Sequence, residues 1–320
     1  MKKFIFLSLV IAFCLTILPI KTFAAGSSFV GSLNNTNKSS EGATLSGITL
    51  SPVLSTISIN KGQTITHNIT VFDNNTTPVT IKVIYANFIS ANQYGQPSFE
   101  QIFKSGINDT DIKVSSQYNI FVPSHKITDI PLTITALPSA LPKEYFISVF
   151  AKIAKVSSNS STNVHLAGAV GSLLLIRVNG NANQSGFIKK FSSNSTYYNQ
   201  TPVNFTTDFV DTGNVHLVPQ GVIDIYDMFG NKVATIPFNP SRNIVLPVGI
   251  NSRIFNTQWN SGRLLLGEYT AKLIVSFGYN TVTTTESDST FWIIPYWFVA
   301  IIVLFILFIL WRIILRILKK

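Results

Sequence analysis

The chain has 320 residues, of which 46% are hydrophobic and 12% are charged, and its formal net charge is +10. It contains one cysteine, which excludes a fold held together by disulfides within the chain. The net charge alone would fit a nucleic-acid-binding protein, but much of it lies at the two ends of the chain. We therefore expect no nucleic-acid partner.

The N-terminal segment reads MKKFIFLSLVIAFCLTILPIKTFAAG. Two lysines precede an apolar run, and small residues follow it, which is the pattern of a secretory signal peptide. Cys14 lies inside the run, and Phe13 stands where a lipoprotein signal has a small residue. We therefore predict a signal peptide over residues 1–25 and a mature chain without cysteine.

A Ser-, Asn- and Gly-rich stretch follows, and it contains too few apolar residues to fold by itself, so we predict a flexible leader over residues 26–47. From Ile48 onward, β-rich runs such as TITHNITVFD and VTIKVIYANF are separated by Asn, Gly and Pro at short intervals. The side chains alternate in places, with Ile65, Ile69 and Val71 on one face. These runs predict a first β-sandwich over residues 48–182.

A second series of β-rich runs covers residues 183–290 and predicts a second sandwich. VIDIYDMFGNKVATI is a hairpin by composition, because Gly230 and Asn231 can adopt the positive φ that a tight turn needs. No run before residue 291 has a helical period. The fold class expected is therefore an all-β ectodomain of two tandem immunoglobulin-like antiparallel β-sandwiches, plus one C-terminal transmembrane helix.

The C-terminal segment has no charged residue between Asp288 and Arg312. About twenty apolar residues in a helix cover the ~30 Å hydrocarbon layer of a membrane. We predict a transmembrane helix over residues 291–311 and a basic cytoplasmic tail over residues 312–320. The residues expected at the two membrane interfaces are Trp292, Trp297, Trp311, Arg312 and Arg316.

The basic residues of these two end segments account for most of the net charge. Removal of the seven at positions 2, 3, 21, 312, 316, 319 and 320 from the net charge of +10 leaves about +3 for the part between them. Positive residues next to a span stay in the cytoplasm, so we expect a single-pass protein of the cell membrane with its ectodomain outside the cytoplasm.

The first series of strands resembles the N-terminal domain of the WxL-interacting surface proteins of Gram-positive bacteria. The resemblance rests on ITLSPVLSTISINKGQTITHNITVFDNNTTPVTIKV, ITDIPLTITALPSALPKEYFISVFAKI and GAVGSLLLIRVNG, in which the matching positions are Pro52, Gly62, Pro138, Pro142, Tyr145 and Gly171. It implies that the first sandwich binds peptidoglycan, that a second sandwich binds a host or partner molecule, and that a C-terminal helix anchors the chain.

Catalytic and metal-binding patterns are absent from the sequence. The four histidines are scattered, and His216 beside Asp211 is read as a residue that caps or bridges a turn. Asp109 and Asp111 lack the Gly and Glu of a calcium loop, and Asp224 and Asp227 are expected on opposite faces of a strand. We therefore expect neither an enzyme nor a cofactor or metal.

Asn-x-Ser/Thr sequons are frequent, and they indicate either glycosylation or the Asn-rich composition of the chain. In either case the surface is rich in uncharged hydrogen-bonding groups, which suits a sugar polymer. Two stretches are expected to be exposed binding loops, Gln93–Gly106 and Ser157–Gly168. In the first of them, Tyr94, Phe99 and Phe103 are the candidate ligand contacts.

Two functions are compatible with this pattern. One is a membrane-anchored binding or adhesion protein whose first sandwich binds peptidoglycan, another cell-wall polymer or a surface protein. The other is a structural or accessory subunit that assembles with envelope proteins through the edges of its sandwiches.

Overall fold

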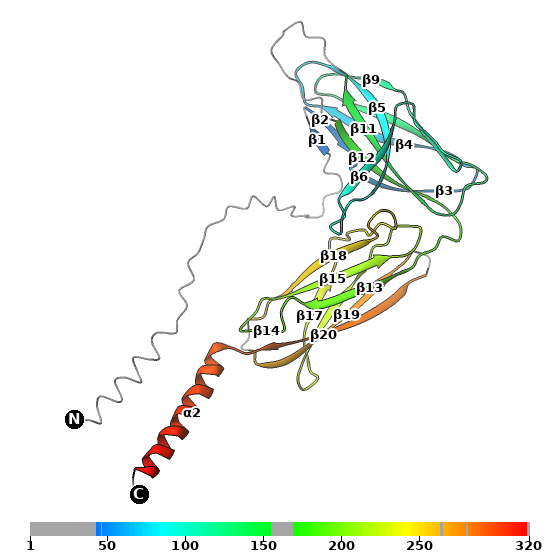
Figure 1. The fold of residues 1–320 in the computed structure, drawn as a ribbon. Coiled ribbons are helices and arrows are strands. Elements are labelled where there is room, and N and C mark those ends of the chain that lie inside the picture. Colours follow the sequence, from blue (N-terminus) through cyan, green and yellow to red (C-terminus); the bar gives the residue numbers. More distant parts are fainter. Residues whose placement is uncertain (1–42, 46, 155–168, 263–264, 280, 319–320) are drawn as a thin grey trace. The chain divides into compact units, whose positions relative to one another are not determined.

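The computed structural model describes residues 43–45, 47–154, 169–262, 265–279 and 281–318, and the predicted signal peptide lies outside them. Within these ranges the chain forms β-strands and one long C-terminal helix (Figure 1). The predicted fold class is confirmed, because both strand-rich regions form immunoglobulin-like sandwiches and a single apolar helix follows them.

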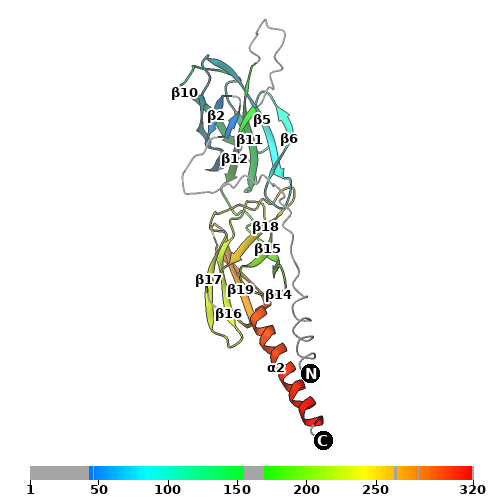
Figure 2. The same cartoon turned by 90° about the vertical axis from the view of Figure 1, so that its left-hand side faces the viewer.

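The first sandwich consists of a six-stranded sheet in the order β1-β2-β4-β10-β8-β7 and a second sheet in the order β3-β12-β11-β5-β6, with β9 also paired to β5. Figure 2 shows β2 and β10 in one layer and β5, β11, β12 and β6 in the other. The strands are β1 (Ala43–Leu45), β2 (Ile48–Ser51), β3 (Leu54–Ile59), β4 (Thr64–Asp73), β5 (Val79–Ser90), β6 (Pro97–Phe103), β7 (Ile107–Asn108), β8 (Ile112–Ser115), β9 (Asn119–Val122), β10 (Ile127–Ala136), β11 (Glu144–Ile153) and β12 (Ala169–Val178).

Alternation along these strands builds the core of the first sandwich. Strand β3 alternates exposed and buried positions throughout, and β5 places Ile81, Val83 and Tyr85 in the space between the sheets. In the first sandwich one pair departs from the antiparallel arrangement that we predicted, because β3 runs parallel to β12. The chain reaches this position by crossing from β2 in one sheet to β3 in the other within two residues, so β3 arrives beside β12 in the same direction.

The second sandwich pairs a three-stranded sheet, β13-β15-β18, with a five-stranded sheet, β14-β20-β19-β16-β17. Its core is rich in aromatic residues, and Phe291 contacts the rings of Tyr198, Phe205, Trp259 and Tyr269. The strands are β13 (Gly186–Ser193), β14 (Tyr197–Tyr198), β15 (Val203–Asp211), β16 (Gln220–Asp227), β17 (Lys232–Phe238), β18 (Ser252–Trp259), β19 (Gly267–Phe277) and β20 (Thr283–Ile293).

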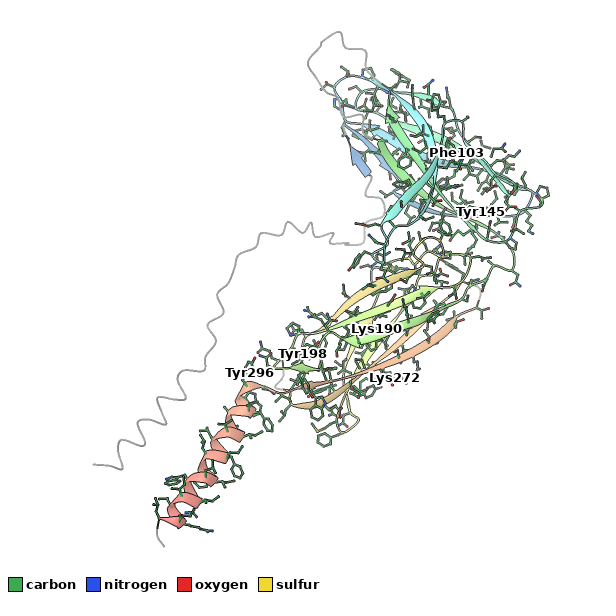
Figure 3. All side chains as sticks on the ribbon, in the orientation of Figure 1. Phe103, Tyr145, Lys190, Tyr198, Lys272 and Tyr296 are labelled. Atoms are coloured by element: carbon green, nitrogen blue, oxygen red, sulfur yellow. The ribbon has the colours of Figure 1, made fainter. Side chains whose placement is uncertain are left out.

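The helix begins later than we predicted. Strand β20 continues to Ile293 with Phe291 and Ile293 buried in the sandwich core, so α2 (Tyr296–Ile317) starts after Pro295 rather than at residue 291. The helix also includes Arg312 and Arg316, which we had assigned to a tail beyond it. Tyr296, at its first turn, is labelled in Figure 3. In the described part of the chain α2 is the one helix long and apolar enough to cross a membrane.

The end of the predicted leader is also ordered differently. Residues 26–42 lie outside the described part, but Ala43–Leu45 forms β1 and pairs with β2 in an antiparallel register. A short hydrogen-bonded strand therefore precedes the position at which we placed the start of the first sandwich.

Candidate functional site

The two sandwiches share a small hydrophobic core of their own. Phe88, Phe146 and Leu175 project from the outer face of the sheet that contains β5, β11 and β12, and Leu246 from the second sandwich packs against them. All four side chains are at most 7% exposed, so the contact excludes water from both partners. The sandwiches are consequently joined by packing as well as by the chain between β12 and β13.

A buried polar pair crosses the same junction. Glu144, the first residue of β11, accepts hydrogen bonds from the backbone N–H of His216 at 2.7 Å and from His216 Nδ1 at 2.7 and 2.9 Å. Both side chains are almost fully buried. The Tyr279 hydroxyl is hydrogen-bonded to His216 Nε2, and the Arg177 guanidinium lies 4.6 Å from the centre of the Tyr279 ring. This group therefore combines residues of both sandwiches.

The loop that carries His216 is fixed on both sides. The backbone N–H of Glu144 donates to the carbonyl of Asn214 at 3.0 Å, and Asn214 Nδ2 donates to the carbonyl of Pro142 at 3.3 Å. Asp211, at the end of β15, accepts a hydrogen bond from the backbone N–H of Gly213 at 2.8 Å. These bonds hold the imidazole against Glu144.

Burial governs the ionisation of this group. It raises the pKa of the Asp211 carboxyl to about 7, and the charge of Glu144 adds to the effect, whereas the hydrogen bond from Gly213 lowers it. Burial and the charge of Glu144 also raise the pKa of Tyr279, so its phenol stays protonated at neutral pH. Both carboxylate oxygens of Glu144 are occupied by His216. The arrangement fits a structural joint better than an acid–base pair that acts on a substrate.

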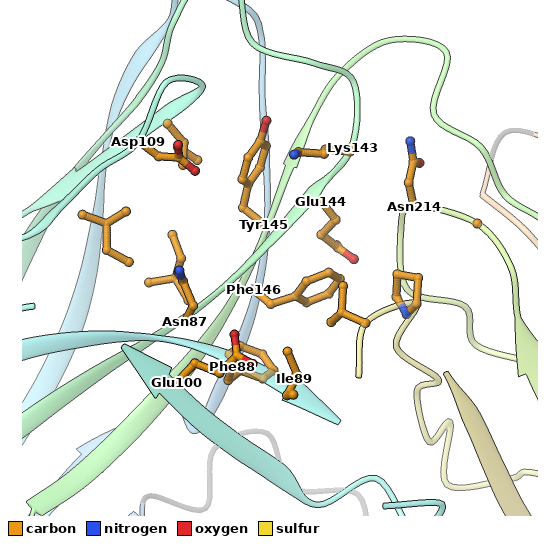
Figure 4. A pocket seen from close by; sticks show the side chains of 16 residues that line it. Asn87, Phe88, Ile89, Glu100, Asp109, Lys143, Glu144, Tyr145, Phe146 and Asn214 are labelled. Atoms are coloured by element: carbon orange, nitrogen blue, oxygen red, sulfur yellow. The ribbon is translucent and has the colours of Figure 1, made fainter. Parts of the chain in front are cut away.

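A cleft with polar and apolar walls opens beside the joint (Figure 4). It encloses about 340 Å³, and Glu100, Asp109, Lys143, Tyr145 and Asn214 are among the residues that line it. Two of these residues bind Asp111 nearby: the Tyr145 hydroxyl donates to it at 2.8 Å, and Lys143 Nζ lies 3.7 Å from it. Among the described residues we find no group of three or more His, Cys, Asp or Glu that could hold a metal ion.

A second cleft of about 480 Å³ lies between the edges of β17 and β18, with Tyr94 at its rim. The loop between β5 and β6 brings Tyr94 there, because the backbone N–H of Ile254 donates to the carbonyl of Gln93 at 2.7 Å and Gln93 Nε2 donates to Ser252 Oγ at 3.2 Å. The backbone N–H of Tyr94 is bonded to Asn92 Oδ1 at 2.9 Å, yet 64% of the residue's surface is exposed. The backbone at Tyr94 is therefore anchored while the ring is presented to solvent.

The structure separates the three predicted ligand contacts. Tyr94 lies at the rim of the second cleft, and Phe99 lies on the outer face of the first sandwich, with its ring centroid 4.8 Å from that of Phe150. Phe103, labelled in Figure 3, packs against the core between the sheets and is unsuited to ligand contact.

The stretch Gln93–Gly106 is not the single open loop that we predicted. Residues 97–103 form β6, because Phe103 and Ile102 lie opposite Tyr85 and Ala86 of β5 and extend the sheet. The other predicted loop, Ser157–Gly168, lies outside the described residues.

The predicted membrane-interface residues divide into two groups. Trp292 lies in β20, opposite Glu268 and Tyr197, and belongs to the second sandwich. Trp297 occupies the first turn of α2, and Trp311, Arg312 and Arg316 lie toward its C-terminal end. The predicted span therefore retains an aromatic residue near each end after its start moves to Tyr296.

The pair of Glu144 and His216 was missed by sequence reasoning. His216 was singled out in the sequence, but its partner is 72 residues away in another sandwich, and we had placed it beside Asp211 as a local turn residue. The available signal was Glu144 itself, since a carboxylate at the start of the otherwise uncharged run EYFISVF requires a partner if it is buried.

Comparison with known proteins finds no matching family model and no matching curated protein. Among solved structures, the class 5 fimbriae chaperone CfaA is 15% identical with a TM-score of 0.40, over 76% of this chain and 98% of that one. A chain from a chaperone–tip adhesin complex of CFA/I fimbriae is 12% identical (TM-score 0.42; 76% and 99% covered), and the E. coli chaperone DraB is 11% identical (0.33; 75% and 95%). At these values the likeness carries no argument about function.

Proposed function

We propose that the protein is a single-pass membrane-anchored binding protein of the cell surface, whose two sandwiches lie outside the cytoplasm and bind a cell-wall polymer. Helix α2 supports the anchor, because an 18-residue stretch of it has a mean hydropathy of 3.1 and its 22 residues extend for about 33 Å. Its C-terminal Arg312 and Arg316 favour a cytoplasmic C-terminus, which leaves the sandwiches on the outer side.

The cleft at Tyr94 is the observation that carries the choice of ligand. No carboxylate lines it, and its wall consists largely of uncharged hydrogen-bonding groups: Asn239, Ser241, Asn243, Asn256, Thr257 and Gln258. The single charged side chain, Arg253, donates to the carbonyl of Ile244 at 2.8 Å, and burial lowers its pKa. Amide and hydroxyl groups beside an exposed aromatic ring match the hydroxyls and the apolar ring faces of a sugar polymer.

Internal bonds fix the walls of this cleft. Asn239 Nδ2 donates to the carbonyls of Pro219 at 2.7 Å and Asn243 at 2.9 Å, and Asn239 Oδ1 accepts from the backbone N–H of Asn243 at 2.8 Å. Gln258 Nε2 donates to Asn204 Oδ1 at 3.2 Å, and Thr206 Oγ1, which donates to Asn194 Oδ1 at 2.7 Å, lies 3.4 Å from Asn256 Oδ1. The Asn256 Nδ2 and Gln258 Oε1 atoms remain to bind a ligand, so a polymer would meet a wall that is already organised.

The resemblance to WxL-interacting proteins suggests peptidoglycan as the polymer. It assigns that ligand to the first sandwich, whereas this cleft is lined mainly by the second sandwich and receives Tyr94 from the first. The test is retention of the full-length protein, solubilised in detergent, on peptidoglycan sacculi purified from the producing organism. We expect the wild type to sediment with the sacculi and Tyr94→Ala to bind about tenfold more weakly, which corresponds to about 1.4 kcal/mol. Tyr197→Ala is the matched control, because that tyrosine is 66% exposed elsewhere on the second sandwich.

Two results would count against the proposal. A wild type that stays in the supernatant would exclude the wall polymer as ligand. Equal retention of the wild type and Tyr94→Ala would exclude the cleft as its site.

A further inference from the structure

A row of four residues crosses the outer face of the first sandwich in strict register. Lys152 of β11 lies directly opposite Lys82 of β5, and the row continues to Ala169 on one side and Asn119 on the other. Side chains directly opposite each other in an antiparallel pair are about 5 Å apart at Cβ, and like charges there are destabilising. The first sandwich therefore holds two cations side by side at an energetic cost.

The described part of this face offers them no carboxylate. Neither lysine forms an ion pair with another described residue, and Lys82 Nζ lies 5.8 Å from the centre of the Tyr118 ring. Alternation along β3, β5, β9, β11 and β12 places one acid on this face, Glu144, which is already bound to His216. Strand β6 carries a second acid, Glu100, at the register shift between its pairs with Phe88 and Ala86, where it lines the cleft beside the joint. The positive charges of Lys82 and Lys152 are therefore not balanced by an ion pair with any carboxylate of the described residues.

Apolar side chains surround the two lysines along the strand direction. Phe121 lies two residues beyond the lysine row on one side, opposite Thr80. On the other side come Ile84, which is opposite Phe150, and then Ile102, which is opposite Ala86. Ile102 is 66% exposed and Phe121 61% exposed. Phe150 covers Gly171, where a Cβ atom would lie 2.8 Å from the ring, so the aromatic surface is closely packed.

The face also ends at an open edge. Strands β6 and β9 both pair with β5, and in the described part of the chain neither has a strand on its other side. Unpaired strand edges with apolar side chains are sites at which another chain can add.

We propose that this face docks an extended segment of a partner protein, with acidic and apolar side chains in the order apolar-x-acidic-x-apolar-x-apolar. Every second side chain of an extended segment faces the sheet, at intervals of about 6.8 Å, which is also the spacing of successive rows on the sheet. The acidic residue would meet Lys82 and Lys152, and the apolar ones would meet Phe121, Ile84 with Phe150, and Ile102. The apolar side chains on both sides of the lysine pair favour a protein segment over a phosphate- or carboxylate-bearing polymer.

The test uses the full-length protein in detergent and a short fluorescent peptide. The peptide has the sequence Val-Ser-Glu-Ser-Val-Ser-Val, in which Val and Glu take the apolar and acidic positions and Ser separates them. A peptide with Lys in place of Glu, and inorganic polyphosphate as competitor, are the comparisons. We expect anisotropy to show at least about tenfold preference for the Glu peptide, and this preference to weaken as salt rises from about 50 to about 500 mM, because screening shortens the range of the charges.

Charge reversal identifies the site. The double variant Lys82→Glu, Lys152→Glu should prefer the Lys peptide, whereas Lys61→Glu, Lys126→Glu should behave as the wild type, because those two exposed lysines of the same sandwich lie outside the face. Ile102→Ser should weaken binding about tenfold without a change in charge. The neutral pair Lys82→Gln, Lys152→Gln should lose binding and keep or raise the unfolding temperature, which separates lost binding from misfolding.

Three outcomes would overturn the proposal: no preference of the wild type for the Glu peptide, unchanged preference in the charge-reversed variant, or displacement of the peptide by polyphosphate in both the wild type and Ile102→Ser.

The cleft at Tyr94 is independent of this face. Tyr94→Ala should therefore bind the peptide normally, and the lysine variants should still bind sacculi if both proposals hold.

Discussion

Glu144 and His216 form a buried hydrogen-bonded pair across two sandwiches, with a shortest distance of 2.7 Å between a carboxylate oxygen and the imidazole. Without His216, the Glu144 carboxylate would be buried without these hydrogen bonds, and without Glu144, His216 would keep only the bond from Nε2 to Tyr279, because neither side chain reaches solvent. The pair therefore fixes how the second sandwich meets the first, and hence where Tyr94 lies relative to the cleft that it borders.

Replacement of Glu144 by Gln should uncouple the two sandwiches. The amide keeps the shape but loses the charge that strengthens the bonds from His216, so we expect a loss of about 2 kcal/mol. All four tryptophans lie C-terminal to the first sandwich, so tryptophan fluorescence does not report the unfolding of that sandwich. Circular dichroism, in contrast, reports the loss of strands in both sandwiches. The two unfolding transitions should coincide in the wild type and separate in the variant.

Glu286→Gln is the control for this change. It removes one carboxylate from the surface pair of Lys272 and Glu286, whose side chains are 37% and 50% exposed, and solvent screening makes such pairs weak. Its transitions should stay together. Coincident, unshifted transitions in Glu144→Gln would contradict the role of the joint.

Asp211 should make the stability of the protein fall as pH rises. Its folded-state pKa of about 7 is above its ordinary value of 3.8, so between these values the folded state binds the extra proton. Stability from this group is complete below about pH 4 and is lost as pH approaches 7, with a slope of at most ~1.4 kcal/mol per pH unit. The Asp211 Oδ2 atom, which has no hydrogen-bond partner within the described residues, is the atom that would carry the proton.

Chemical unfolding of the wild type and of Asp211→Asn across pH 4 to 8 measures this contribution. The asparagine can still accept the bond from Gly213 and does not titrate, so the difference in stability between the two proteins should change steadily up to about pH 7 and then level off. A difference independent of pH would show that Asp211 is ionised throughout.

Leu246→Ala tests the apolar half of the junction. The side chain is 7% exposed and packs against residues of the first sandwich, and loss of a buried leucine typically costs about 2–5 kcal/mol. We expect the second sandwich to retain its own unfolding temperature while protease cleavage between the sandwiches becomes faster. Met228→Ala is a suitable control, because that side chain is 51% exposed. Unchanged proteolysis would indicate that the polar pair alone holds the joint.

Local patterns predicted the features that depend on neighbouring residues. Ile69 and Val71 are fully buried as their alternation required, and Gly230 has a φ of +81° in the turn between β16 and β17. The location of Tyr94 was not predictable in this way, because it follows from hydrogen bonds between Gln93 and residues of β18 about 160 positions later. Contacts between the two sandwiches leave no periodic pattern in the sequence, so they could not be predicted from it.

The start of the C-terminal apolar helix shows the same limit. Phe291 and Ile293 are as apolar as the residues of α2, so hydropathy assigns them to the span. Their burial depends on strand β19, which pairs with β20 through its full length and places alternate side chains in the aromatic core. Composition cannot distinguish an apolar strand end from an apolar helix start without that partner.

Phe291→Ala and Trp292→Ala should therefore differ sharply although they are adjacent. Phe291 is fully buried among four aromatic rings, and its truncation should destabilise the second sandwich by about 3–5 kcal/mol. Trp292 is 38% exposed on the opposite side of β20, so its truncation should destabilise the second sandwich much less. Thermal unfolding of the full-length protein in detergent, followed by circular dichroism, compares them. If both residues lay in the membrane helix, the two variants would unfold at nearly the wild-type temperature, because neither would remove a contact from the sandwich.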